Sequence, residues 1–255
     1  MPATPVSPSA PWSADPYSDA LRTGRGPLYL RRPDGWLLPL DVERWCARAD
    51  AADLEALRRC EGAVLDVGCG PGRLVAELAA LGRPALGIDV SEAAVAHTVR
   101  LGGQALRRSV FEQLPGEGRW DTALLIDGNV GIGGDPAALL RRMSQLLAPG
   151  GLLIVEAVPD MDVDERVHVH VVRVADTHGA VGPAFPWARL GTAALLRRAV
   201  RAGWQVDGQW EAGGRSFVAL RNRSTSSAAE PPNSAAVINS QRVRNPSPDR
   251  EVADR

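Results

Sequence analysis

Lysine is missing from this sequence, and cysteine and histidine are scarce. All 29 basic residues among the 255 are arginine, a bias that we attribute to codon usage rather than to phosphate recognition. The three cysteines, Cys46, Cys60 and Cys69, form neither a CxxC pair nor an even disulfide set. The four histidines are spread along the chain, so we predict no metal site.

The sequence also lacks an excess of charge and a long apolar run. Its formal net charge of -1 gives no electrostatic reason to expect a nucleic acid or an anionic membrane as partner. No apolar run approaches the roughly 18–20 residues that span a bilayer, and the N-terminus has no secretory pattern. Because 45% of the residues are hydrophobic, enough for a buried core, we expect a globular cytoplasmic protein.

The composition divides the chain into four parts. Residues 1–14 and 223–255 are rich in small and polar residues and in proline, without a periodic apolar face, and we predict disordered tails. Residues 15–60 are expected to form an N-terminal cap segment that becomes helical from about Asp41. Residues 61–222 hold the main domain.

Within the main domain, predicted strands and helices alternate. Gly82 ends one predicted helix, Ser91 caps the next, and Asp135 caps a third, which has Pro136 at its first position. This alternation predicts a doubly wound α/β sheet with helices on both faces. The expected strands cover residues 62–68, 84–89, 103–109, 120–128 and 152–158.

The pattern changes after the fifth strand. Residues 166–176 alternate at period two, which predicts an extra strand with one solvated face. A helix over 192–202 follows, and segments 204–210 and 215–222 are typical of an antiparallel hairpin. The sheet is therefore expected to be mostly parallel, with an antiparallel C-terminal hairpin strand.

The stretch VLDVGCGPGRLVAEL places three glycines after the first of these strands. Their spacing is G-x-G-x-G, and Arg73 stands where a dinucleotide fingerprint has its third glycine, so it would crowd the strand unless it turned outward. Asp66 precedes the loop, where it would repel a pyrophosphate or satisfy loop amides, while Asp89 ends the next strand and can accept from ribose hydroxyls. The pattern favours a nucleoside that carries a positively charged amino acid.

The segment VLDVGCGPGRLVAELAALGRPALGIDVS resembles the first two motifs of class I S-adenosylmethionine-dependent methyltransferases, and LRRMSQLLAPGGLLIVEA resembles their later helix, turn and fifth strand. The resemblance covers about residues 63–222. It implies a Rossmann-like methyltransferase sheet and S-adenosylmethionine as cofactor. By position, it implies cofactor contacts from Asp66, Gly68, Cys69, Gly70, Gly72, Asp89, Val90, Ser109, Val110, Asp127 and Gly128. Many members carry an acid where this chain has Ser109, with Glu112 three residues on, which leaves the adenine contacts open.

The acceptor is harder to predict. Segment 127–136 lacks the Asn/Asp-Pro-Pro-Tyr/Phe motif of enzymes that methylate DNA bases or glutamine, and its glycines suggest either a flexible floor for a small acceptor or a loop that only reaches the Asp135 cap. No cluster of acids supports a metal-dependent, catechol-type reaction. The candidate general bases are His168, His170, His178, Asp127 and Glu156, with a solvated strand face as the plainer role for the first two.

We therefore predict a methyltransferase, monomeric or homodimeric, that acts on oxygen or nitrogen of a small-molecule acceptor. The alternative is a non-catalytic protein of the same fold that binds the cofactor. A nicotinamide-dependent oxidoreductase is disfavoured by Arg73 and the glycine spacing. An aminopropyltransferase would need a more acidic site. In methyltransferases of this kind such an N-terminal segment commonly closes over the active site. Its aromatic and arginine side chains could bind an acidic or aromatic acceptor, or the segment could only pack against the core. These side chains are Tyr17, Arg25, Tyr29, Arg31, Arg32 and Trp36.

Overall fold

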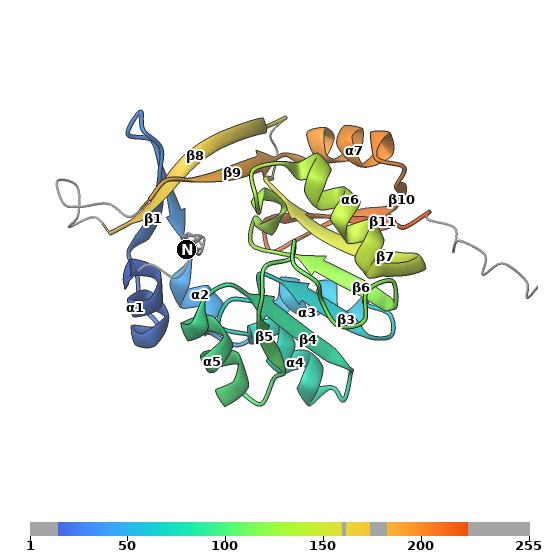
Figure 1. Cartoon of the computed structure of the whole chain (residues 1–255), viewed down its shortest axis with the longest axis horizontal. Helices are drawn as coiled ribbons and strands as arrows, with labels where there is room; N and C mark the ends of the chain where they lie inside the picture. The colour runs from blue at the N-terminus through green and yellow to red at the C-terminus, as the bar shows by residue number, and fades with distance from the viewer. Residues whose placement is uncertain (1–14, 160–161, 174–182, 224–255) are drawn as a thin grey trace, which may run out of the picture.

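The computed structural model describes residues 15–159, 162–173 and 183–223, and it contains two sheets (Figure 1). The larger sheet has seven strands in the order β10-β11-β7-β6-β3-β4-β5, and the smaller has four in the order β2-β1-β8-β9. Of the two predicted tails, only Arg223 lies within the described residues. The predicted boundary after residue 60 stays a prediction.

The seven-stranded sheet confirms the predicted fold class. Its first five strands pair in parallel, and the last two form an antiparallel hairpin that pairs with β7. The strands are β3 (Val64–Val67), β4 (Ala85–Asp89), β5 (Ala105–Arg107), β6 (Trp120–Leu125), β7 (Leu147–Ala157), β10 (Gln205–Ala212) and β11 (Arg215–Arg221).

Helices cover both faces of this sheet, as predicted. One face packs against α6 (Pro136–Leu146) and α7 (Thr192–Arg201), while α3 (Ala51–Arg58), α4 (Arg73–Ala80) and α5 (Glu92–Arg100) lie on the other side (Figure 1). The predicted caps are confirmed. The Ser91 side chain accepts a hydrogen bond from the amide of the third residue of α5, and Asp135 accepts from two amides at the start of α6. None of the helices in the described part of the chain has the length and apolarity of a membrane span.

The four-stranded sheet was largely missed by the sequence patterns. We call this sheet, together with α1 (Asp15–Thr23) and α2 (Val42–Cys46), the cap. The strand predicted over residues 166–176 covers most of β8, and residues 174–176 of that prediction lie outside the described ranges. The helical stretch predicted from about Asp41 contains α2 and α3. The sequence patterns missed α1 and the three short strands, of which β1 pairs with the neighbouring β2 and also, far along the chain, with β8. The strands are β1 (Leu28–Arg31), β2 (Leu37–Leu40), β8 (Asp164–Val172) and β9 (Phe185–Leu190).

The cap has a hydrophobic core of its own. Leu28 and Leu30 of β1 are buried together with Val169 and Val171 of β8, and α1 contributes Leu21. Along β8 the opposite face carries His168, which is exposed, and His170, which is half-buried. This alternation is the solvated face predicted from the period-two pattern. The face of the cap opposite these histidines holds its hydrophobic core, and cap residues of β9 and α2 lie across a pocket from the ends of the parallel strands.

Candidate active site

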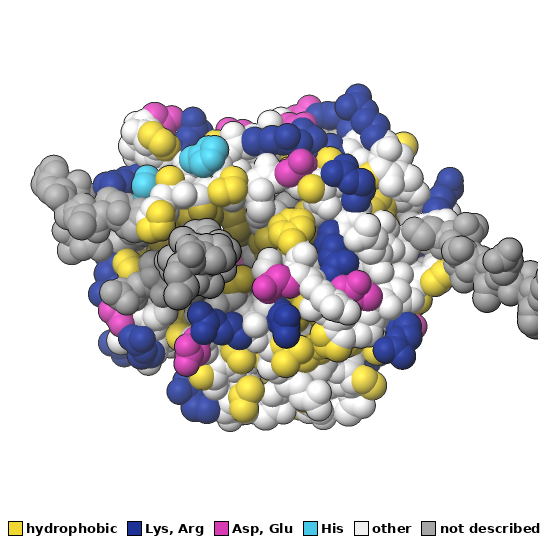
Figure 2. All heavy atoms as spheres, in the orientation of Figure 1, with side chains coloured by type: hydrophobic (Ala, Val, Ile, Leu, Met, Phe, Trp, Pro, Cys, Tyr) yellow, Lys and Arg dark blue, Asp and Glu magenta, His cyan; other side chains and the backbone are white. Residues whose placement is uncertain are grey.

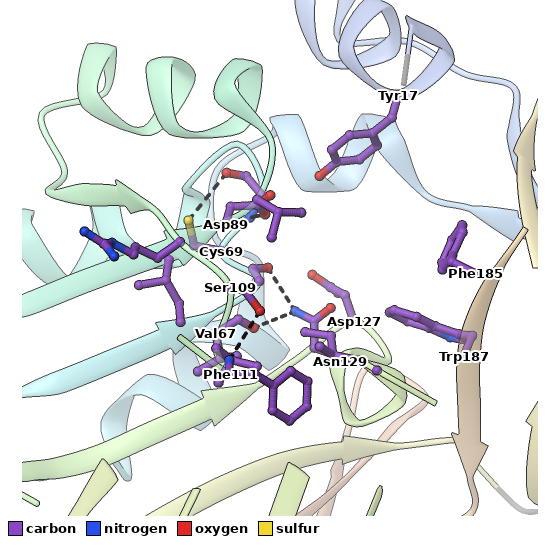
Figure 3. Close-up of a pocket in the computed structure, with 18 of the residues that line it drawn as sticks. Tyr17, Val67, Cys69, Asp89, Ser109, Phe111, Asp127, Asn129, Phe185 and Trp187 are labelled. Carbon is purple, nitrogen blue, oxygen red and sulfur yellow. Dashed lines mark hydrogen bonds between the residues drawn. The ribbon is translucent and has the colours of Figure 1, made fainter. Parts of the chain in front are cut away.

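A pocket of about 490 Å³ lies between the cap and the carboxyl ends of β3, β4 and β6. In doubly wound sheets this edge is where ligands bind, and the volume is typical of a small-molecule site. Figure 2 shows hydrophobic side chains gathered in a hollow on the face turned to the viewer. The residues that line the pocket come from both the main sheet and the cap (Figure 3).

Most of the residues predicted to contact the cofactor line this pocket. Asp66, Gly72 and Gly128 are the exceptions, because they do not belong to its lining. Gly72 instead lies against Thr98 of α5, whose hydroxyl would be 2.4 Å from a Cβ atom at that position. The predicted residues that do line the pocket are Gly68, Cys69, Gly70, Asp89, Val90, Ser109, Val110 and Asp127.

The glycine loop presents an open surface to the pocket. The amides of Gly68 and Cys69 both donate to the carbonyl of Ile88, which fixes the loop to β4. Gly70 has a φ of 53°, and a Cβ atom there would meet only the Tyr17 hydroxyl, at 3.7 Å. Space is therefore left for a ligand between the loop and α1. This cradle fits the amino-acid part of S-adenosylmethionine.

Asp89 stands at the end of β4 beside this loop. Its carboxylate accepts hydrogen bonds from the amides of Gly70, at 3.0 Å, and Ser91, at 2.8 Å. Burial raises the pKa of Asp89 to about 6. The Val90 amide also interacts with this carboxylate. Since a carboxylate offers about four acceptor sites, the group can still accept from a ribose hydroxyl.

Asp66 lies beneath the loop rather than beside the ligand space. Its side chain is buried, and no described residue donates a hydrogen bond to its Oδ2 atom. Burial, with the nearby carboxylates of Asp53, Asp89 and Asp127, raises the pKa of Asp66 to about 7, although Arg73 opposes the shift. Asp66 therefore carries a proton over much of the pH range in which an ordinary aspartate is ionised.

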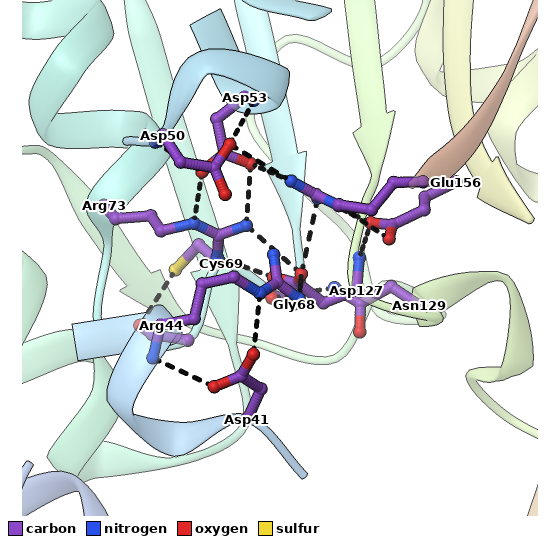
Figure 4. Close-up of polar contacts among 12 residues, drawn as sticks. Asp41, Arg44, Asp50, Asp53, Gly68, Cys69, Arg73, Asp127, Asn129 and Glu156 are labelled. Carbon is purple, nitrogen blue, oxygen red and sulfur yellow. Dashed lines mark hydrogen bonds and ion pairs between the residues drawn. The ribbon is translucent and has the colours of Figure 1, made fainter. Parts of the chain in front are cut away.

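Arg73 does not turn outward, contrary to the prediction. It is buried, with its Nε and Nη2 atoms donating to Asp53 at 2.8 and 2.9 Å, and its Nη1 atom donating to Asp127 at 2.6 Å (Figure 4). The strand is not crowded because the side chain runs to the carboxylates of α3 and the end of β6. These partners raise the pKa of Arg73, although its burial has the opposite effect, and the arginine stays charged.

The ion pairs around Arg73 extend into a partly buried network. Arg215 of β11 donates to Asp53 at 2.8 Å and to both oxygens of Glu156, at 2.7 and 2.9 Å. Arg44 of α2 lies 2.7 Å from Asp127, which also accepts from Arg73. We call Arg44, Arg73, Arg215, Asp53, Asp127 and Glu156 the arginine network (Figure 4).

The arginine network contains two of the candidate general bases, Asp127 and Glu156. Glu156 is committed to Arg215 and to the amide of Asp127, and it does not line the pocket. His168 and His170 lie on the outer face of β8 and do not line it either, and His178 lies outside the described residues. Asp127 alone among the candidates lines the pocket, and its carboxylate is held by Arg44 and Arg73.

Two aromatic residues of β9, which the sequence patterns did not single out as site residues, form the end of the pocket opposite Asp89 (Figure 3). Phe185 and Trp187 of β9 have their ring centroids 6.3 Å apart in an edge-to-face arrangement. Tyr17 of α1 and Trp45 of α2 form a second edge-to-face pair, at 6.5 Å. The aromatic content of the N-terminal cap segment was a signal for the second pair, whereas β9 gave none.

The glycine-rich segment after β6 is packed rather than flexible, which corrects the prediction of a flexible floor. A Cβ atom at Gly131 would lie 2.2 Å from the carbonyl oxygen of Ala188 and 2.6 Å from the Trp187 ring. One at Gly134 would lie 2.6 Å from the Cβ atom of Pro186. These glycines therefore let β9 approach the floor closely, and the segment also ends at the predicted Asp135 cap.

The fold and the pocket define a Rossmann-like protein with a nucleoside-type site. A family model described as a methyltransferase domain matches residues 39–194, more than half of the chain, and the chain belongs to this family. This match confirms the predicted class, the S-adenosylmethionine-dependent methyltransferases, and with it the predicted cofactor.

Relatives and solved structures agree with the family. A ubiquinone biosynthesis O-methyltransferase of Caulobacter sp. (strain K31) is 33% identical over 162 residues, which cover 56% of this chain and 63% of that protein. The chain thus spans a little under two thirds of this relative. A methyltransferase of Bacteroides fragilis in complex with S-adenosylhomocysteine matches with a TM-score of 0.65 and 19% identity, over 80% of this chain and 91% of its own.

A third similar protein is the 1,6-didemethyltoxoflavin-N1-methyltransferase of Burkholderia thailandensis. It matches with a TM-score of 0.50 and 19% identity, over 68% of this chain and 79% of its own. At this level of identity the two solved structures support the fold alone.

Proposed function

We propose that this chain transfers the methyl group of S-adenosylmethionine to an oxygen or nitrogen atom of a small-molecule acceptor. The observation that carries the proposal is a pocket that joins the glycine loop and Asp89 at one end to an apolar, aromatic wall at the other. One compartment thus offers a place for a cofactor beside a place for an acceptor. The similar proteins named above include enzymes that act at oxygen and at nitrogen.

In this proposal the chain acts mainly by binding and alignment. When bound, S-adenosylmethionine supplies a methyl group on a sulfonium, which becomes a neutral thioether as the acceptor's lone pair takes the methyl group. The loop at Gly68 and Gly70 would hold the amino-acid part, and Asp89 the ribose. The cap would orient the acceptor, which is how a protein accelerates a displacement whose leaving group needs no protonation.

One observation favours the alternative, a non-catalytic protein that binds the cofactor. Among the described residues that line the pocket there is no histidine, and the Asp127 carboxylate is held by arginines. The two functions predict the same binding of S-adenosylmethionine and differ only in turnover. The cytoplasmic location and the monomeric or homodimeric state stay predictions.

Calorimetric titration with S-adenosylmethionine, S-adenosylhomocysteine and NADH tests the cofactor. We expect the two sulfur nucleosides to bind and NADH not to bind. Asp89→Ala should weaken S-adenosylhomocysteine binding by about 10- to 100-fold, because hydrogen bonds to a charged group are lost, whereas Asp207→Ala on the exposed side of β10 should not. Wild-type affinity should also fall as the pH drops below about 6, where Asp89 becomes protonated. Binding of NADH instead would refute the proposal.

Turnover separates the enzyme from the non-catalytic alternative. The protein is incubated with S-adenosylmethionine and a pool of cellular small metabolites, and the S-adenosylhomocysteine formed is quantified against the Asp89→Ala variant. Formation by the wild type alone supports the enzyme. Tight binding without formation in any pool supports the alternative.

A further inference from the structure

Asn129 occupies the centre of the pocket, at the first residue of the short 3-10 helix η2 (Asn129–Gly131). Its Nδ2 atom donates to the carbonyls of Val67 and Gly68, each at 2.9 Å. Both amide hydrogens are used in this way, which fixes the orientation of the side chain. A Cβ atom at Gly68 would lie 2.7 Å from this Nδ2 atom, so the glycine is what lets the amide reach the loop.

The Oδ1 atom of Asn129 remains as an acceptor. Within the described ranges no protein group donates to it, and the atom is not among the buried polar atoms left without a partner. Figure 3 shows Asn129 beside Asp127, between the loop end at Cys69 and Asp89 and the aromatic end at Phe185 and Trp187. A fixed hydrogen-bond acceptor therefore stands where the cofactor and acceptor ends of the pocket meet.

As far as the described residues form it, the aromatic end is apolar and carries no charge of its own. Among the described residues that line the pocket, those contributed by β2, α2 and segment 183–187 are all uncharged. The charged side chains of the lining are Asp89 and Arg108 at the other end, and Arg73 and Asp127, which pair with each other. An ionic acceptor would find no counter-charge at the aromatic end, so its burial there would be costly.

The shape of this end is also fixed. Trp187 rests on Gly131, where a side chain would clash, and it pairs by an isolated β-bridge with Ile132. Phe185 and Trp187 are 6% and 7% exposed, so their rings have little freedom to move. A preformed apolar wall of aromatic rings suits a flat, rigid ligand better than a flexible polar one.

We propose that the acceptor is a flat, uncharged aromatic molecule whose reacting O–H or N–H group donates a hydrogen bond to Asn129 Oδ1. This inference rests on the proposed function and names its substrate class. The hydrogen bond turns a lone pair of the same oxygen or nitrogen toward the cofactor end. In the transfer, that pair forms the new bond to carbon, the carbon–sulfur bond breaks with its electrons staying on sulfur, and the acceptor's proton passes to water.

Three probes of one shape test the proposal on the full chain saturated with S-adenosylhomocysteine. Binding of naphthalene, 1-naphthol and 1-naphthoate is followed by quenching of tryptophan fluorescence. We expect 1-naphthol to bind about fivefold more tightly than naphthalene, the value of one net hydrogen bond, and 1-naphthoate at least about tenfold more weakly than 1-naphthol. Equal affinity for the first two probes, preference for the carboxylate, or no binding of any probe would overturn the proposal.

Variants of Asn129 and Trp187 show which side chain is responsible for each difference in probe affinity. In Asn129→Ala and Asn129→Ser the ratio of 1-naphthol to naphthalene affinity should fall to about one, and this ratio is insensitive to a general loss of affinity. Trp187→Leu should weaken both probes, whereas Trp36→Leu should weaken neither, because Trp36 packs between Arg32 and Arg189 outside the pocket. An unchanged ratio in both Asn129 variants would refute the role of Asn129. Intact S-adenosylhomocysteine binding with failed probe binding would sink this inference and leave the proposed function standing.

Discussion

The two ends of the pocket are built in different ways. At the cofactor end, Gly70 and Asp89 are joined by a hydrogen bond and stand only 19 residues apart. The aromatic end brings Ile132, which follows β6, together with Trp187 of β9, and these two residues stand 55 positions apart in the chain. The first end rests on a contiguous motif and the second on long-range packing. An end built locally leaves a pattern in the sequence, whereas one assembled from distant segments does not.

The arginine network offers the strongest test of whether the two ends are independent. Asp53 is buried between Arg73 and Arg215, so Asp53→Ala leaves one buried and one half-buried cation with fewer partners. We expect the free energy of unfolding to fall by roughly 3–5 kcal/mol, measured by urea denaturation. Because Arg73 also holds Asp127, binding at both ends should weaken.

A matched control lies on the same helix. Glu55→Ala removes an exposed carboxylate that pairs with Arg58 and Arg59, and it should leave stability unchanged. Burial alone would raise the pKa of Asp53, but its ion pairs and hydrogen bonds with Arg73 and Arg215 lower that pKa below the usual value of an aspartate. The stability that Asp53 contributes is therefore present at pH values above the usual pKa of an aspartate, and it is lost when the pH falls through the lowered pKa. Equal stability of the two variants would show that the network contributes little.

The second test concerns only the cofactor end. Since the pKa of Asp66 is raised to about 7, the native state holds a proton that the unfolded state loses above about pH 4. The stability from this group is therefore present below about pH 4 and is lost as the pH rises to about 7, by up to about 4 kcal/mol. Asp66→Asn should flatten this decline in denaturation curves taken across that range.

For comparison, Asp207→Asn replaces an exposed carboxylate of β10 and should keep the wild-type pH profile. Probe binding at the aromatic end should not change in Asp66→Asn. Because the pKa of Asp89 is also raised, to about 6, a smaller decline should remain in this variant. A decline as large as that of the wild type would mean that Asp66 is not responsible.

The prediction with the smallest expected loss of stability tests whether the aromatic end can be changed without affecting the cofactor end. Gly131→Ala places a Cβ atom against the Ala188 carbonyl and the Trp187 ring, which should cost about 1–3 kcal/mol of stability. It should weaken aromatic probes while S-adenosylhomocysteine affinity stays the same in calorimetry. Gly208→Ala on β10 has open space around the new atom and should change stability by less than about 0.5 kcal/mol. Loss of cofactor affinity in Gly131→Ala would break the distinction between the ends.

The difference between the locally built cofactor end and the aromatic end also decides how much of the molecule could be predicted from the sequence. The main sheet, its helices and the loop up to Asp89 gave clear signals, because strand runs, caps and glycine spacing are local features. Arg73 was misjudged because its partners, Asp53 and Asp127, are 20 and 54 residues away. β9 and the position of Asn129 depend on long-range contacts, and no local pattern specifies which side chains meet across a pocket.

The link between Asp53 and Arg215 spans 162 residues, and it has a consequence for how the protein matures. During synthesis Asp53 emerges early, whereas Arg215 belongs to β11, the last strand of the sheet. The N-terminal region can therefore complete its ion pairs only after nearly all of the described chain has left the ribosome. Until then Asp53 lacks one of its two arginines, so we expect nascent chains that end before β11 to remain sensitive to proteases near α3.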